Sequence, residues 1–131
     1  MRDLYSNVKT VEAFVIAAIS SDTTTAGVEV DLLKYNSCLF VAQAGTVTDG
    51  TYTPLIQESD TSGSYSGSVA DTDLIGTEAA AVLSVTSDIK KIGYKGSKRY
   101  VKLSYVSAST TSGGTVGASA ILGNPSDAPV A

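Results

Sequence analysis

Short segments of β-forming residues, separated by turn signals every 8 to 15 residues, constrain the fold of this chain more than any other feature. Within residues 27–33, apolar and acidic side chains alternate strictly, which is typical of a half-buried strand. No segment shows a long 3.6-residue pattern with helix caps at its ends. The pattern predicts an all-β fold: an antiparallel β-sandwich, jelly-roll-like, with about eight short strands.

The expected strands lie between clusters of Gly, Pro, Asn, Asp and Ser. They comprise residues 11–19, 27–33, 38–44, 52–58, 89–94, 99–107 and 116–122, with a short buried piece or turn at 74–77. The alanines of residues 11–19 also permit a helix, and residues 79–85 fit either a strand or one helical turn. The nearly continuous apolar run of residues 38–44 predicts a strand that is buried on both faces.

Three further segments carry turn or edge signals. Asp49-Gly50 stands between two strand-like runs and predicts a hairpin turn. Pro54 lacks a backbone donor, which places its strand at a sheet edge or a bulge. The Ser and Gly content of residues 59–68 predicts a mobile loop tip with Tyr65 in its middle.

The length of 131 residues and the absence of internal repeats predict one β-sandwich domain over residues 1–131. Residues 1–10 are expected to form an N-terminal arm, and residues 124–131 a proline-punctuated C-terminal tail. Hydrophobic residues make up 43% of the chain and charged residues only 17%, which leaves the surface to Ser, Thr, Gly and Ala. Such a surface suits a protein packed against neighbours, but an ordinary Thr- and Ser-rich β-domain has it too.

The residues that most enzymes and metal sites need are scarce. The chain has no histidine and no phosphate-binding loop motif, and its single cysteine, Cys38, lies in an apolar run. The acidic pairs, such as Asp71 with Asp73, lack the spacing of a calcium loop and fit solvated loop acids. The apolar run 13–19 is too short to span a bilayer. We therefore expect no enzymatic activity, no catalytic residue, no cofactor, no metal and no membrane partner.

Basic residues concentrate in one part of an otherwise acidic chain of net charge −4. Six of the nine basic residues fall within residues 90–102, with two tyrosines between them, and the N-terminal arm adds two large apolar side chains. The candidate protein-interface residues are Lys90, Lys91, Tyr94, Lys95, Lys98, Arg99, Tyr100, Lys102, Leu4 and Tyr5. A solvated hairpin whose lysines protect an edge strand explains the basic segment equally well. A nucleic-acid partner is disfavoured by the net charge.

Several stretches of the chain resemble a family of small phage and prophage virion proteins. They are residues 1–7 (MRDLYSN), 57–60 (QESD), 74–78 (LIGTE), 93–101 (GYKGSKRYV) and 122–125 (LGNP). The resemblance implies a non-enzymatic virion structural protein of the capsid decoration, or cement, type, which binds and stabilises the shell of the major capsid protein. It implies assembly in the host cytoplasm, a place on the capsid surface and a homo-oligomer, dimer or trimer. It transfers no catalytic residue and no contact residue.

Two other functions stay open at this point. One is a head–tail connector or a tail component. The other is a carbohydrate-binding module on the virion surface, in which Tyr52 or Tyr65 would take the place of the tryptophan that commonly stacks on a sugar ring.

Overall fold

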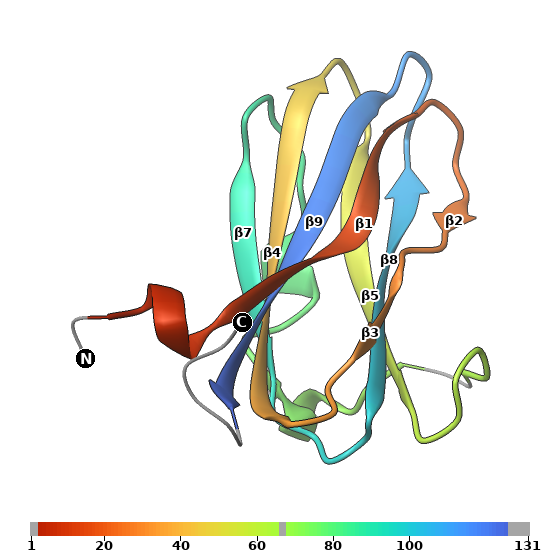
Figure 1. Cartoon of the computed structure of the whole chain (residues 1–131). Helices are drawn as coiled ribbons and strands as arrows, with labels where there is room; N and C mark the ends of the chain where they lie inside the picture. Colours follow the sequence, from red (N-terminus) through yellow and green to blue (C-terminus); the bar gives the residue numbers. More distant parts are fainter. Residues whose placement is uncertain (1–2, 66–67, 126–131) are drawn as a thin grey trace.

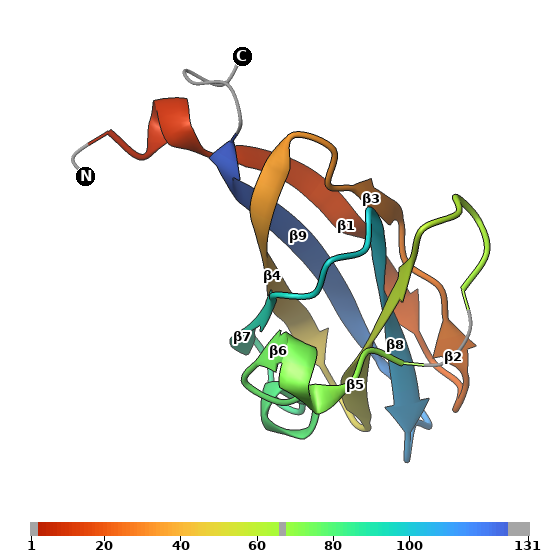
Figure 2. The same cartoon turned by 90° about the horizontal axis from the view of Figure 1, so that it is seen from below.

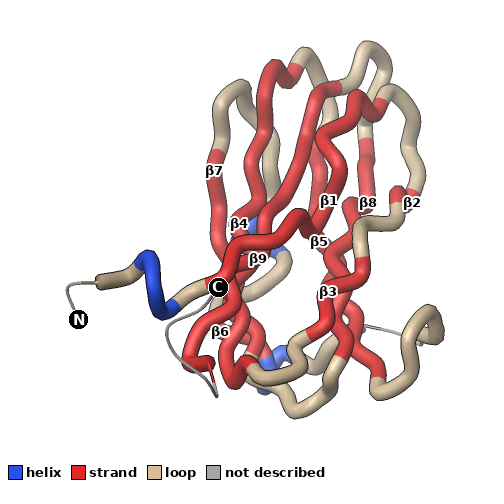
Figure 3. The backbone as a smooth tube through the Cα atoms, viewed as in Figure 1, coloured by secondary structure: helices blue, strands red, loops and turns tan. Residues whose placement is uncertain are grey.

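The computed structural model describes residues 3–65 and 68–125, which form two antiparallel β-sheets packed face to face (Figures 1 and 2). The strands are β1 (Lys9–Ile19), β2 (Thr24–Thr25), β3 (Glu29–Asp31), β4 (Tyr35–Val47), β5 (Thr51–Ser59), β6 (Leu74–Ile75), β7 (Ile89–Tyr94), β8 (Tyr100–Ala108) and β9 (Gly114–Pro125). The 3₁₀ turns are η1 (Tyr5–Asn7), η2 (Asp71–Asp73) and η3 (Ala79–Ala81). The described residues contain no α-helix, so the expected all-β sandwich is confirmed (Figure 3).

Strand pairing follows a nested order. The first sheet has the order β1-β9-β4-β7-β6, and in the second sheet β8 pairs with β5 on one side and with β2 and β3 on the other. The first strand thus pairs with the last, β2 and β3 with β8, and β4 with β7. This nesting is the connectivity of a jelly roll, in which antiparallel pairs wrap around one core.

The inward faces of both sheets form one apolar core. Phe40 and Tyr105 are fully buried there, and the rings of Phe14 and Tyr105 meet edge to face with centroids 4.7 Å apart. The Tyr105 hydroxyl donates to the Gly117 carbonyl oxygen at 2.8 Å, so its polar end is satisfied inside the core. Burying each large side chain of this kind contributes roughly 1.5–3 kcal/mol.

Residues 11–19 form a strand, and the helical alternative is wrong for this segment. Two register shifts bend β1, between Glu12 and Phe14 and between Phe14 and Ala17. The bend lets β1 contact both sheets, because the Ala13 carbonyl oxygen accepts from the Val28 amide at 2.8 Å. Lys9 and Thr10, expected in the arm, already pair with β9.

Most of the other expected elements have the expected type in the structure, but their lengths differ from the predicted ones. Residues 79–85 contain the 3₁₀ turn η3, and β3 is shorter than expected. The strand β4 is longer because Lys34, with a φ of 72°, completes the turn alone and the strand begins at Tyr35. Asn124 and Pro125 end β9, and residues 126–131 lie outside the described residues.

Pro54 lies where its missing donor does no harm, as expected for an edge strand. One side of β5 pairs with β8, and the other side meets single contacts instead of a strand. Tyr52 forms a bridge with Leu83, and the Ile56 amide donates to Glu78 Oε1 at 2.6 Å. Pro54 stands between these two residues on the same side, so no ladder bond is lost.

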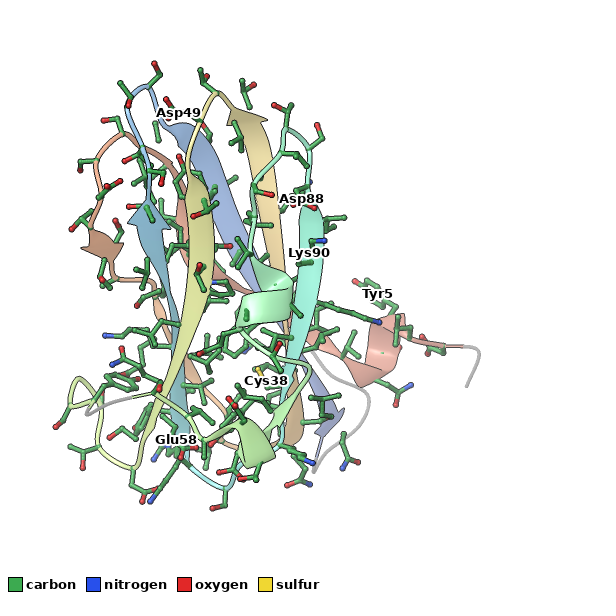
Figure 4. All side chains as sticks on the ribbon, turned by 180° about the vertical axis from the view of Figure 1, so that it is seen from behind. Tyr5, Cys38, Asp49, Glu58, Asp88 and Lys90 are labelled. Carbon is green, nitrogen blue, oxygen red and sulfur yellow. The ribbon has the colours of Figure 1, made fainter. Side chains whose placement is uncertain are left out.

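The hairpin expected at Asp49-Gly50 is wrong, because the two strands it joins belong to different sheets. The side chain of Asp49 instead ties this crossing to the β8–β9 crossing beside it (Figure 4). Its carboxylate accepts from the amides of Thr111 (3.0 Å), Ser112 (3.0 Å) and Gly113 (2.7 Å). These bonds hold the pKa of Asp49 below its ordinary value.

The loop after β5 is anchored over its described part, whereas the sequence predicts a mobile tip there. Glu29 of β3 accepts from Ser62 Oγ (2.6 Å), the Gly63 amide (2.7 Å) and the Tyr65 hydroxyl (2.7 Å). Lys102 lies over the Tyr65 ring, 4.6 Å from its centroid. Residues 66–67 lie outside the described residues.

Replacing the Asp49 carboxylate should remove a pH-dependent part of the stability. Its pKa is lowered in the folded state, so its contribution is present above the unfolded value, about 3.9, and is lost as the pH falls through the folded value. Thermal melts should place Asp49→Asn below wild type at pH 7, with the gap closing below about pH 4. Asp71→Asn is the control, because that exposed side chain accepts no hydrogen bond from the described residues. A gap that stays constant with pH would contradict the assignment.

Glu29→Gln should release the anchored loop. The amide replaces a charged acceptor of three hydrogen bonds, so chymotrypsin should cleave after Tyr65 several-fold faster in the variant. Asp60→Asn, in the same loop but bonded only to Lys98, is the control. Equal cleavage of Glu29→Gln and wild type would show that Glu29 does not hold the loop.

Candidate functional site

The basic segment of residues 90–102 does not form one patch in the structure. Lys90 and Lys91 lie on β7, the lysines and arginine that follow lie in the loop after it, and Lys102 lies on β8 in the other sheet. Lys90 and Lys91 also point to opposite faces, because Lys90 pairs with the buried Ala42 and Lys91 with Val41 of the outer face.

Two of the six basic residues of this segment pair with carboxylates from distant parts of the chain. Lys98 Nζ lies 2.8 Å from Asp60 Oδ2, and Arg99 forms a two-pronged pair with Asp31 at 2.9 Å for both contacts. The Arg99 pair lowers the pKa of Asp31. Such exposed pairs are screened by solvent and contribute little to stability, but they compensate the charge locally.

The remaining basic residues of the segment lie farther from carboxylate oxygens. Lys90 Nζ lies 3.7 Å from Asp88 Oδ1, and Figure 4 shows both side chains near the start of β7. Lys91, Lys95 and Lys102 meet no carboxylate within 4.0 Å among residues 3–65 and 68–125. Half of the six basic residues are therefore paired with carboxylates, which reduces the positive potential that the segment offers to an anionic partner.

The two tyrosines of the segment are engaged inside the protein. Tyr94 is buried, donates to the Glu58 carboxylate, and accepts from the Lys98 amide at 3.1 Å. Burial raises the pKa of Tyr94 above its ordinary value. Tyr100 is half-buried and carries the Arg99 guanidinium 4.9 Å above its ring. Tyr94 therefore holds the β7–β8 connection and presents no contact surface.

The other two predicted interface residues stand away from the sandwich. Leu4 and Tyr5 begin the turn η1, with exposed fractions of 58% and 90%, and Figures 1 and 4 show this arm projecting from one corner of the body. Asp3 shapes the turn, because its carboxylate accepts from the Ser6 amide at 3.0 Å and its carbonyl from Asn7. The arm thus has a defined local shape and an uncovered apolar end.

An outer face with exposed apolar side chains lies on the outside of the five-stranded sheet. Figure 1 looks onto this face, and no further layer of described sheet or helix covers it. Ile16, Ile75 and Ile89 are 73%, 64% and 60% exposed there. Exposed apolar side chains that gather on one face mark interaction sites in soluble proteins.

A shallow groove of about 480 Å³ runs along this outer face over β9. Its floor is formed by small residues of β9, such as Gly117 and Ser119, and its walls come from β1 and β4. The outward residues lining it are Thr10, Glu12, Ile16, Val41, Gln43, Gly45, Thr115, Gly117 and Ser119. A Cβ at Gly117 would come within 2.7 Å of Ile16 Cγ1, so glycine at this position lets Ile16 lie across the groove end.

This outer face was not predicted from the sequence, although the apolar run of residues 38–44 carries a signal for it. Residues 38–44 predict a strand buried on both faces, and that expectation is wrong for the single chain. Cys38, Phe40 and Ala42 are buried, whereas the outward side of the strand is covered by no described segment. An apolar run with two apolar faces, only one of them covered, predicts that another molecule covers the second.

The single cysteine, Cys38, is free and buried. Burial raises the pKa of the Cys38 thiol to about 12, which keeps the sulfur protonated. No group of three or more His, Cys, Asp or Glu side chains placed to hold a metal ion occurs within residues 3–65 and 68–125. Over the same residues, no helix has the length and apolar character needed to cross a membrane.

The comparisons with known proteins find likenesses among solved structures alone. No family model and no curated protein sequence matches the chain. Among solved structures, the chain is similar to the SPBc2 prophage-derived protein YomS, with a TM-score of 0.48 and 17% sequence identity over 88% of this chain and 92% of that one. No statement about function follows from a likeness of this size.

Proposed function

We propose that this chain is a non-enzymatic structural protein of a phage or prophage virion, of the capsid decoration type, which binds the shell of the major capsid protein. The observation that carries the proposal is the placement of its exposed apolar side chains. Ile16, Ile75 and Ile89 lie exposed on the outer face of the five-stranded sheet, and Leu4 and Tyr5 lie exposed on the N-terminal arm, where no described segment covers them.

The charge distribution supports a protein partner over a nucleic acid. The net charge is −4, and three of the six basic residues in the segment that looked separate in the sequence pair with Asp31, Asp60 and Asp88. Binding to a phosphate backbone draws on uncompensated positive charge. An apolar, weakly charged surface is instead suited to packing against a protein shell.

The resemblance of residues 1–7, 57–60, 74–78, 93–101 and 122–125 to small virion proteins gives this binding role its place on the capsid. The jelly-roll sandwich suits that role, because a decoration protein must fold alone before it docks. A head–tail connector would use the same surfaces, so its distinction from a decoration protein is the number of copies in a particle.

The tyrosines named for the carbohydrate alternative do not offer a stacking platform. Tyr52 is fully buried, and its hydroxyl donates to the carbonyl oxygens of Ile19 and Asp49, each at 3.2 Å. Tyr65 is held by Glu29 and has Lys102 over its ring. We therefore do not propose carbohydrate binding for these residues.

Quantitative mass spectrometry of purified particles tests the proposal. We expect a copy number equal to that of the major capsid protein or a simple fraction of it, because decoration sites repeat with the shell. A few copies per particle would move the protein to the connector or the tail. Its absence from particles would overturn the virion assignment.

The arm should contribute directly to shell binding. Removing both exposed side chains with Leu4→Ala and Tyr5→Ala should leave the melting temperature unchanged and weaken binding to purified shells about 30-fold, as expected for an aromatic anchor worth roughly 2 kcal/mol. Leu33→Ala, an exposed leucine in the β3–β4 turn, is the matched control. Wild-type binding of the double variant in a co-sedimentation assay would exclude the arm from the contact.

A further inference from the structure

We propose that the outer face of the five-stranded sheet is the interface of a symmetric dimer of this chain, with the two-fold axis running along the strands between β9 and β4. The proposal does not depend on the virion assignment. It rests on how the residues of the face are arranged in register across β1, β9, β4 and β7.

The charged residues of the face stand at the two ends of one cross-strand row. The pairings join Glu12 to Ser119, Ser119 to Val41, and Val41 to Lys91. Glu12 and Lys91 are both exposed, and three strand spacings of about 4.8 Å separate them, so they are too far apart to pair within one chain. Each of them lacks a carboxylate or amine partner among the described residues.

A two-fold axis along the strands brings these charges together between two copies. Rotation about it places β1 of one copy opposite β7 of the other at the same height along the strands. Glu12 then faces the partner's Lys91, and Lys91 faces the partner's Glu12, which forms two equivalent ion pairs.

The alternative axis, directed across the strands, is disfavoured by the same two residues. It would leave each strand opposite its own copy. At the height of this row Glu12 would then face Glu12 and Lys91 would face Lys91, and at any other height both charges would face uncharged outward residues of the same strand. Like charges placed opposite each other at an interface disfavour association. The charge pattern therefore selects the axis along the strands and the aligned sheet packing that this axis produces.

The sizes of the outward side chains on β9 and β4 agree with this axis. Opposite the small residues of β9 the rotation places β4 of the partner, which carries larger outward side chains. Val41 then meets the groove floor at the partner's Ser119, and Gln43 meets it at the partner's Gly117. A ridge thus enters a groove on each side of the axis, which is the complementarity that packed sheets require.

The apolar side chains are matched in the two neighbouring rows. In one row, Ile121 pairs with Leu39 within the sheet. Across the axis, Ile121 meets the partner's Leu39, and Leu39 meets the partner's Ile121. In the other row, Ile16 lies against Gly117, which is in register with Gln43 and Ile89. Ile16 therefore meets the partner's Ile89, and two of the most exposed isoleucines cover each other.

Sedimentation velocity of the purified chain between about 1 and 100 µM tests the dimer. We expect the mass to rise with concentration from 13.4 kDa toward twice that value. The reversals Glu12→Lys and Lys91→Glu, made singly, should each weaken association at least about tenfold, because each places like charges opposite one another. The two reversals together should restore it.

Rescue by the double reversal is the deciding observation, because the two positions do not touch within one chain. Lys95→Glu, an exposed lysine in the loop beyond the face, should leave association unchanged, and thermal melts should show that all variants fold. Should one reversal impair folding, the other still carries the single-variant test. A monomer at 100 µM, a trimer, a single reversal without effect, or a double reversal that fails to restore the dimer would each overturn the proposal.

Discussion

Small side chains on both faces of β9 are the constraint on which the rest of the structure depends. This strand lies between β1 and β4, and its inward Ala118 and Ala120 leave the space that the core aromatics fill. Larger residues there would overpack the core at a cost of roughly 1–3 kcal/mol. The Gly117 carbonyl accepts the buried Tyr105 hydroxyl, and on the outer face Gly117 and Ser119 form the groove floor. One strand thus sets both the core packing and the relief of the exposed face.

The fold class could be predicted from the sequence because strand alternation is a local property. Val101, Leu103 and Tyr105 alternate along β8 and are all buried, as their period implies. The predictions that were wrong concern residues whose interaction partners lie far away in the sequence. Asp49-Gly50 is a residue pair typical of hairpin turns, but the Asp49 side chain accepts hydrogen bonds from amides more than sixty residues away in the sequence. No turn rule contains that information, since the rule concerns only adjacent residues.

The candidate site was harder to predict than the fold, for the same reason. The basic run of residues 90–102 is contiguous in sequence, yet strand geometry divides it among a sheet edge, a loop and the other sheet. Its acids, such as Asp31 and Asp60, come from far along the chain. The apolar face shows the reverse situation, because its residues are scattered in sequence and meet only through register. A surface built from four strands is visible only once their pairing is known.

Hydroxyl-radical footprinting of the purified chain tests most directly whether the outer face of the five-stranded sheet is covered in solution. If a second copy of the chain covers this face, Ile16 and Ile89 lose reactivity as the protein concentration rises from about 1 to 100 µM, because the second copy buries both side chains. Leu33, exposed in the β3–β4 turn, should keep its reactivity throughout. Equal and unchanged reactivity of Ile16, Ile89 and Leu33 over this range would contradict the account and leave the face open to solvent.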